Sequence, residues 1–198
     1  MLQSKQRLLE LNSKLAETLT SKGVTATADE TTTALVNKVA NITSGDDSVL
    51  RGLIQRNLTE IVIPDGVTVI GVSSFYQCTK LKSVTIPESV NRVDSIAFNY
   101  CSSLKNLTIL SKSIYIMDSA FRNCNALEYV YLPFNFSCQI LNLSASTLYT
   151  RETILQWLNA LADRTGQTAY KLTIGATNLA KLTEEDILIA TNKNWTLA

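Results

Sequence analysis

The feature that most constrains the fold of this chain is a repeat of ~23 residues between Leu58 and Pro133. Six sets of similar side chains share this spacing. They are Leu58, Leu81, Leu104 and Leu127; Ile61, Val84, Leu107 and Val130; Ile63, Ile86, Ile109 and Leu132; Ile70, Val93 and Ile116; Phe75, Phe98 and Phe121; and Cys78, Cys101 and Cys124. One such unit cannot bury its own apolar face, whereas stacked copies share a continuous core. The repeat therefore predicts a short solenoid.

Each unit is expected to begin with a short strand in which inward and outward side chains alternate. In the first unit Leu58, Ile61 and Ile63 would point inward, and a second apolar patch, Ile70 with Phe75, would bring the chain back. Successive strands would then lie parallel, ~4.8 Å apart. This arrangement leaves every second strand position on an exposed face.

The pattern L-x-x-ϕ-x-I-P, followed by I-x-x-x-A-F-x-x-C, resembles the leucine-rich repeats of the bacterial surface antigen A type, also called the Treponema-type repeat. The Ala–Phe pair is intact at Ala97–Phe98 and Ala120–Phe121, and it becomes Ser74–Phe75 in the first unit. The resemblance covers residues 58–133. It implies an α/β fold, namely a leucine-rich-repeat solenoid with parallel strands over residues 58–134 that works by binding or assembly.

Three aligned cysteines, Cys78, Cys101 and Cys124, could indicate a metal or redox site, or simply fill the turns. Three thiols in line span nearly ~10 Å, too far to share one tetrahedral zinc ion with ~2.3 Å bonds. Parallel side chains are also poorly aimed for a disulfide, whose Cβ atoms lie ~3.8 Å apart. We therefore predict buried free thiols, with no metal and no cofactor. Cys138 lies outside the register and is predicted to be a lone thiol.

A C-terminal α/β capping unit is predicted over residues 135–198, because the Phe and Cys positions of the fourth unit hold Ser144 and Thr147. We expect roughly three and a half turns before it. Its predicted parts are an irregular stretch at 135–147, a helix from the N-cap Thr150 to a stop at Gly166, a strand at 170–174, a helix from Thr183 to 192–194, and a last strand at 195–197. The order is similar to the unit that closes many gut-bacterial and prophage repeat proteins. Trp157 and Trp195 are interpreted as its core, with carbohydrate stacking as the alternative.

The first 45 residues are predicted to form a helical adaptor, followed by a linker and the N-terminal edge of the solenoid at 46–57. Two apolar stripes are expected, with Leu8, Leu11, Leu15 and Leu19 on one helix and Leu35 and Val39 on the next. A helix pair this small cannot bury both stripes alone. The segment resembles N-terminal segments of tail-fibre and tail-associated proteins of phages and prophages of Gram-positive bacteria. That resemblance implies a homo-oligomer, by analogy a trimer, docked on other tail or baseplate proteins.

The exposed strand positions are the candidate binding site. They form two columns, Glu60, Ser83, Asn106 and Tyr129, and Val62, Thr85, Thr108 and Tyr131. A small, hydroxyl-rich face with tyrosines at one end suits a glycan or the edge of a protein. Phe134 and Phe136 follow, and they either join this surface or pack beneath the cap.

The composition limits the chemistry. The chain contains no histidine, which excludes Ser–His–Asp and Cys–His nucleophilic sites and most catalytic zinc sites. Glu184, Glu185 and Asp186 are better explained as acids at a helix start than as a catalytic carboxylate pair. A formal charge of +1 gives no basic field for nucleic acid, and no apolar run approaches the ~20 residues of a membrane-spanning helix. We therefore predict no catalysis, no nucleic-acid binding and no membrane insertion.

Two functional hypotheses follow. In the first, the chain is a non-enzymatic virion tail component of a phage or prophage, which contacts a host surface glycan or protein through an oligomeric repeat module. Such a protein is made in the bacterial cytoplasm without a signal peptide, and Lys5, Arg7 and Glu10 interrupt the apolar stretch that a signal would need. The alternative is a bacterial leucine-rich-repeat adhesin at the cell surface, or a general protein-interaction module.

Overall fold

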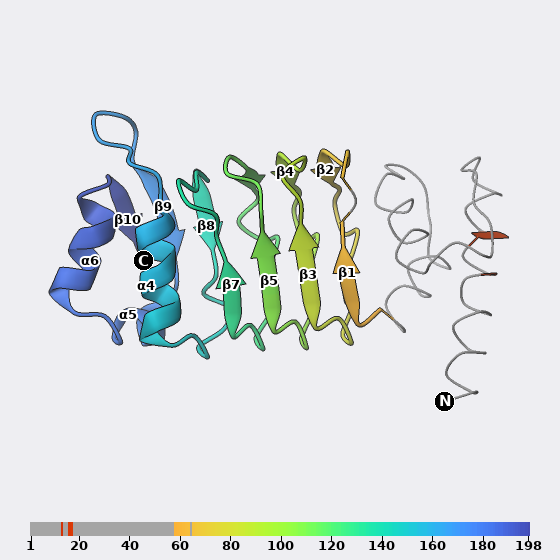
Figure 1. Cartoon of the computed structure of the whole chain (residues 1–198). Coiled ribbons are helices and arrows are strands. Elements are labelled where there is room, and N and C mark those ends of the chain that lie inside the picture. Colours follow the sequence, from red (N-terminus) through yellow and green to blue (C-terminus); the bar gives the residue numbers. More distant parts are fainter. Residues whose placement is uncertain (1–12, 14–15, 18–57, 64) are drawn as a thin grey trace.

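The repeats form two parallel sheets, each with one strand per repeat along the solenoid (Figure 1). The structure, a computed structural model, describes residue 13, residues 16–17, 58–63 and 65–198. The first sheet, in the order β1-β3-β5-β7, contains β1 (Glu60–Val62), β3 (Ser83–Ile86), β5 (Asn106–Ile109) and β7 (Tyr129–Tyr131). The second sheet, in the order β2-β4-β6, contains β2 (Val69–Ile70), β4 (Arg92–Val93) and β6 (Tyr115–Ile116). This architecture confirms the predicted α/β solenoid with parallel strands.

The register of the sheets follows the sequence repeat. Glu60 pairs with Ser83, its equivalent in the next repeat, and Ser83 pairs in turn with Asn106. Inside the solenoid the phenylalanines stack face to face, with ring centroids 5.0 Å apart for Phe75 and Phe98 and 5.3 Å apart for Phe98 and Phe121. Each ring therefore buries the next, so that no turn completes its core without a neighbour.

The cysteine column fills the turns beside these rings. The Cys101 thiol donates to the carbonyl oxygen of Phe75 at 3.2 Å, and the Cys124 thiol donates to that of Phe98 at 3.1 Å. Hydrogen-bonding contact with the thiols of Cys124 and Cys78, together with burial, raises the pKa of Cys101 above its ordinary value. Burial raises the pKa of Cys138 to about 11. All four thiols are free and buried. This confirms the predicted column of buried free thiols at Cys78, Cys101 and Cys124 and the predicted lone thiol at Cys138.

A C-terminal unit of strands and helices follows the repeats. It contains β8 (Ile140–Asn142), α4 (Arg151–Ala160), β9 (Tyr170–Thr173), α5 (Ala176–Leu179), α6 (Glu184–Thr191) and β10 (Trp195–Leu197). Strands β8, β9 and β10 form a third parallel sheet in the order β10-β9-β8. The predicted helices after Thr150 and Thr183, and the strands that follow each of them, are confirmed. Thr150 and Thr183 both act as side-chain N-caps.

Three details differ from the sequence-based expectation. The stretch predicted to be irregular contains β8, whose partner is β9. Helix α4 ends at Ala160 rather than near Gly166, because Leu161 turns to an extended conformation and forms a bridge with Phe136. The short helix α5 was not expected. In the first two cases pairing with residues distant in sequence overrides the local pattern.

Trp157 joins the C-terminal unit to the last repeat. Its indole Nε1 donates to the carbonyl oxygen of Val130 in β7 at 2.6 Å, at the edge where the next strand of the first sheet would lie. Trp195 donates within the unit, to the carbonyl oxygen of Ala162 at 2.9 Å. Both indoles are buried, which confirms the interpretation as core and rules out the alternative of carbohydrate stacking on them. Helix α4 thus covers an edge that would otherwise be open to pairing.

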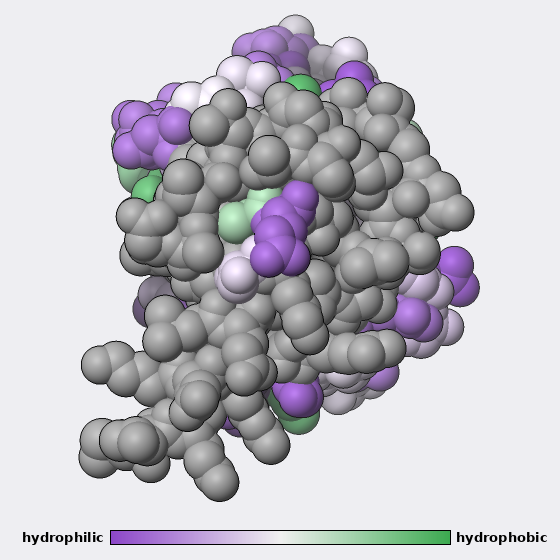
Figure 2. All heavy atoms as spheres, turned by 90° about the vertical axis from the view of Figure 1, so that its right-hand side faces the viewer, coloured by the Kyte–Doolittle hydropathy of each residue, from purple (hydrophilic) through white to green (hydrophobic). Residues whose placement is uncertain are grey.

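Apart from residues 13 and 16–17, the predicted adaptor and linker lie outside the described residues, as do all the stripe residues Leu8, Leu11, Leu15, Leu19, Leu35 and Val39. In the view from the β1 end, the described side chains visible around the rim are mostly hydrophilic (Figure 2). No helix within the described part of the chain is both long and apolar enough to cross a membrane.

Candidate functional site

The exposed face of the first sheet, which we call the strand face, carries the eight residues predicted to bind a partner. The strand register places them in two columns: Glu60, Ser83, Asn106 and Tyr129, and Val62, Thr85, Thr108 and Tyr131. Five are exposed, and the three hydroxyl residues of β3 and β5 are half-buried. The columns exist because inward side chains alternate with them along each strand. The structure therefore brings all eight together on one surface.

Charged side chains flank the strand face. Lys105 and Glu128 form an ion pair at 2.9 Å, and about half of each side chain is exposed to solvent. An ion pair so exposed contributes little to folding stability. Both groups are therefore available to a partner at small energetic cost to the fold.

Aromatic side chains gather at the C-terminal end of the strand face. Tyr129 and Tyr131 are 43% and 42% exposed, and Phe134 is 81% exposed. Phe136, by contrast, is buried and pairs with Leu161 at the end of α4. Of the two alternatives left open for the phenylalanines, Phe134 joins the exposed surface and Phe136 packs beneath the cap. Large exposed aromatics of this kind are enriched where proteins meet partners.

A shallow, open depression of 670 Å³ lies between Phe134 and the outer side of α4. It is lined by Leu132, Phe134, Glu152, Leu155, Gln156, Asn159 and Ala160. Glu152, Gln156 and Asn159 share one helical face at spacings of four and three residues, and Leu155 lies next to them. The depression extends the aromatic end of the strand face onto the C-terminal unit.

The described residues offer little for catalysis or metal binding. No group of three His, Cys, Asp or Glu side chains in the described part of the chain is placed to hold a metal ion. Asp186 accepts from the Thr183 backbone N–H and from both nitrogens of the Arg151 guanidinium facing it, at 2.7–2.8 Å. The acids at 184–186 therefore begin a helix, as predicted from the sequence, and Asp186 completes its capping box.

Comparison with known proteins identifies the repeated part of the chain. Residues 54–150 match the family described as the BspA type Leucine rich repeat region, in six copies. This segment, just under half of the chain, is similar to the BspA-type leucine-rich repeat family. The match confirms the resemblance drawn from the repeat pattern and covers all four strands of the first sheet. It does not reach the segment at 1–45 that resembles phage tail proteins.

Other comparisons add less to this assignment. The crystal structure of a T. pallidum leucine rich repeat protein is similar at 21% identity, with a TM-score of 0.35. The similarity covers 58% of this chain and 46% of that one, so this chain spans less than half of its length. At this TM-score the likeness carries no argument. No curated protein matches the chain.

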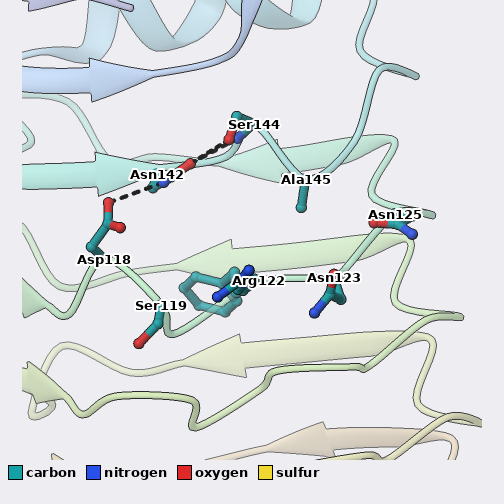
Figure 3. A pocket seen from close by; sticks show the side chains of 9 residues that line it. Asp118, Ser119, Arg122, Asn123, Asn125, Asn142, Ser144 and Ala145 are labelled. Atoms are coloured by element: carbon teal, nitrogen blue, oxygen red, sulfur yellow. Dashed lines mark hydrogen bonds between the residues drawn. The ribbon is translucent and has the colours of Figure 1, made fainter.

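The repeat region also contains a polar hollow that the sequence did not reveal. It lies between the turn after β6 and the segment after β8, and Asp118, Arg122, Asn142 and Ser144 are among its lining residues (Figure 3). The available signal was the break in the phenylalanine column at Ser144. A break in a repeat predicts a change in packing, but it does not say which side chains converge there.

Proposed function

We propose that this chain is a non-enzymatic interaction module whose strand face binds a protein partner, with Tyr129, Tyr131 and Phe134 as the anchoring side chains. The observation that carries the proposal is the register-aligned, exposed strand face that ends in three exposed aromatic residues. Buried aromatic anchors dominate the binding energy of protein interfaces, and tyrosine is among the most enriched of them. The lack of histidine and of a described metal cluster favours binding over catalysis.

The partner can be sought with a photo-crosslinking amino acid at position 131, because Tyr131 is one of the three proposed anchors and is exposed at the end of the strand face. The matched control carries the same amino acid in place of Tyr115, which is 48% exposed in β6 of the second sheet. We expect a discrete adduct from position 131 on whole cells and in extracts of the source organism, and none from position 115. Equal adducts at both positions, or none at 131, would contradict the proposal.

The affinity of variants for the captured partner then shows whether Tyr131 contributes to binding. Tyr131→Ala should weaken binding by roughly tenfold or more, as expected for an aromatic anchor. Tyr115→Ala should leave binding unchanged. Isothermal titration calorimetry with both variants would measure this, and equal losses of affinity would place the interface elsewhere.

The interaction-module hypothesis fits the findings better than the virion-tail hypothesis. The virion-tail hypothesis, with its trimeric state and its contacts with baseplate proteins, depends on residues 1–45. Neither the described residues nor the comparisons support it. A site on a bacterial surface is likewise an expectation. The mass of the full chain in solution, measured by light scattering, tests the oligomer directly, and the mass of a single protomer would contradict it.

A further inference from the structure

The polar hollow lies where the stack of phenylalanine rings ends. Ser144 stands one repeat after Phe121, at the position where a fourth ring would follow. Gly175, at the start of α5, packs so closely that a Cβ built on it would lie 3.3 Å from the Cβ of Ser144. The C-terminal unit thus occupies space that a large side chain at position 144 would need. A hollow of 410 Å³ lies beside this junction, with Phe121 and Ser144 in its wall.

Hydrogen bonds hold one side of the hollow in a defined arrangement (Figure 3). The Asn142 amide donates from Nδ2 to Oδ1 of Asp118 at 3.0 Å. The hydroxyl and the backbone N–H of Ser144 donate to Oδ1 of Asn142 at 2.7 and 3.1 Å. Asp118 follows β6 and Asn142 ends β8, so the network ties the third repeat to the C-terminal unit. A site whose polar groups are already ordered loses less entropy when a ligand binds.

Several polar groups of the hollow make no hydrogen bond to another described residue. These groups are Oδ2 of Asp118, the hydroxyl of Ser119, the guanidinium of Arg122 and the side-chain amide of Asn125. The set combines a carboxylate oxygen that can only accept, a guanidinium that can only donate, and an amide and a hydroxyl that do both. A matching ligand must therefore both donate and accept hydrogen bonds within a small volume.

The charges of the hollow narrow the class of ligand. An anion would meet the carboxylate of Asp118, and a metal cation would meet the guanidinium of Arg122 with a single lining carboxylate to hold it. A neutral hydroxyl-rich molecule meets neither objection, because each hydroxyl donates one hydrogen bond and accepts others. The volume also lies within the range of about 300–1,000 Å³ usual for small-molecule sites. We propose that the hollow binds one neutral sugar unit, such as a hexose or an N-acetylhexosamine of a glycan.

This sugar site is independent of the proposed protein contact. It involves the turn after β6 and the segment after β8, whereas the protein contact involves the exposed face of the first sheet. No residue of the hollow belongs to the two columns of the strand face. Either proposal can therefore fail without the other.

Saturation-transfer NMR on the full chain tests the sugar site. The probes are glucose, galactose, mannose, N-acetylglucosamine and N-acetylgalactosamine, each at about 10 mM, since a small neutral ligand is expected to bind with millimolar affinity. We expect saturable transfer to at least one of them. Asp118→Ala should weaken that binding by roughly tenfold or more, because a hydrogen bond to a charged group is lost. Asp65→Ala, which removes an exposed carboxylate outside the hollow, should leave it unchanged.

A second variant blocks the hollow without removing a charge. Ser119→Tyr places a ring at the wall, and it should abolish transfer while the thermal unfolding midpoint stays within a few degrees of the unmodified chain. Three results would overturn the sugar proposal: no transfer to any of the five probes, binding that survives Asp118→Ala or Ser119→Tyr, or transfer to glucuronate, added as an anionic probe, and to none of the neutral sugars. The last outcome, strengthened by Asp118→Asn, would identify the hollow as an anion site.

Discussion

Left-handed backbone positions carry different residues in the repeats and in the C-terminal unit. In the repeats they are Gly66, with a φ of 91°, and Ser73, Gln77, Ile96, Tyr100 and Asn123, with φ between 52° and 61°. In the C-terminal unit they are Asn135, Gly166, Gly175 and Asn194. Glycine and asparagine enter this region at low cost, whereas a β-branched residue such as Ile96 is strongly disfavoured there. The C-terminal unit thus uses residues suited to its turns, and most repeat positions do not.

Hydrogen bonds between successive turns explain how the repeats keep such conformations. The backbone N–H of Gln77 donates to the carbonyl oxygen of Asn99 at 2.9 Å, and that of Tyr100 donates to Arg122 at 3.1 Å. The neighbouring turn therefore imposes the conformation that the local sequence disfavours. The repeats thus derive stability from their neighbours, whereas the C-terminal unit relies more on local signals such as the N-caps Thr150 and Thr183.

The largest effect is expected from Phe98→Ala in the middle of the ring stack. The substitution removes two stacked contacts at once and leaves a cavity, so the free energy of unfolding should fall by about 3–5 kcal/mol. Urea unfolding followed by circular dichroism would measure it. Phe134→Ala is the control, because that ring is largely exposed and should change stability by less than about 0.5 kcal/mol. A loss below about 1 kcal/mol for Phe98→Ala would show that the turns do not depend on their neighbours in this way.

A smaller effect is expected at the junction, from Trp157→Phe. The ring is largely kept, but the carbonyl oxygen of Val130 loses its donor, which should cost about 1–3 kcal/mol. Hydrogen exchange should quicken in β7 as well as in α4. Trp195→Phe removes the corresponding bond to Ala162 inside the C-terminal unit, so its exchange effect should stay within that unit. Indistinguishable exchange maps for the two variants would argue against Trp157 as the link between the regions.

The two regions also differ in how far the sequence predicts them. The leucine, phenylalanine and cysteine columns repeat strictly, so the first parallel sheet and the strand face follow from spacing alone. The second sheet was expected only as an apolar patch at Ile70, Val93 and Ile116. Strand β8 was missed because the register slips there, with Ser113 bridging to Ser137, just past the position that the repeat spacing gives. The exposure of Phe134 and the burial of Phe136 were open alternatives, since only the long-range bridge to Leu161 separates them.

The polar hollow was beyond prediction for a related reason. It lies beside the contact between Ser144 and Gly175, two residues that no local pattern connects. Asp118 and Asn142 face each other only once β8 has been placed beside the third repeat. Sequence periodicity thus predicts the contacts within a repeat, and it fails where a repeat meets a different structure.

A still smaller effect is expected at low pH, and it should originate in the C-terminal unit. The Arg151 guanidinium, then the backbone N–H of Thr183, hold the pKa of Asp186 below its ordinary value. A carboxyl group whose pKa is lower in the folded state than in the unfolded state stabilises the fold. Its full contribution to the free energy of unfolding is present above the unfolded-state pKa, and this contribution is lost as the pH falls through the folded-state pKa. The free energy of unfolding should therefore decline below a pH of about 4, and more steeply than in Asp186→Asn. Parallel urea titrations from neutral to acid pH test this, and superimposable profiles would contradict it.

The smallest effect is a pair of opposite changes at exposed left-handed positions. Gln77→Asn brings a residue suited to its φ of 59° into the repeats, and should raise the free energy of unfolding by about 0.5 kcal/mol. Asn135→Gln does the reverse at a φ of 66° in the C-terminal unit, and should lower it by a similar amount. Because the two sites are distant and share no partner, the double variant should have nearly the stability of the unmodified chain. If Gln77→Asn is neutral while Asn135→Gln is destabilising, the stacked turns compensate fully for an unsuited residue, and the contrast between the regions becomes stronger. If neither substitution changes the free energy of unfolding, the preference of residues for left-handed positions does not distinguish the repeats from the C-terminal unit.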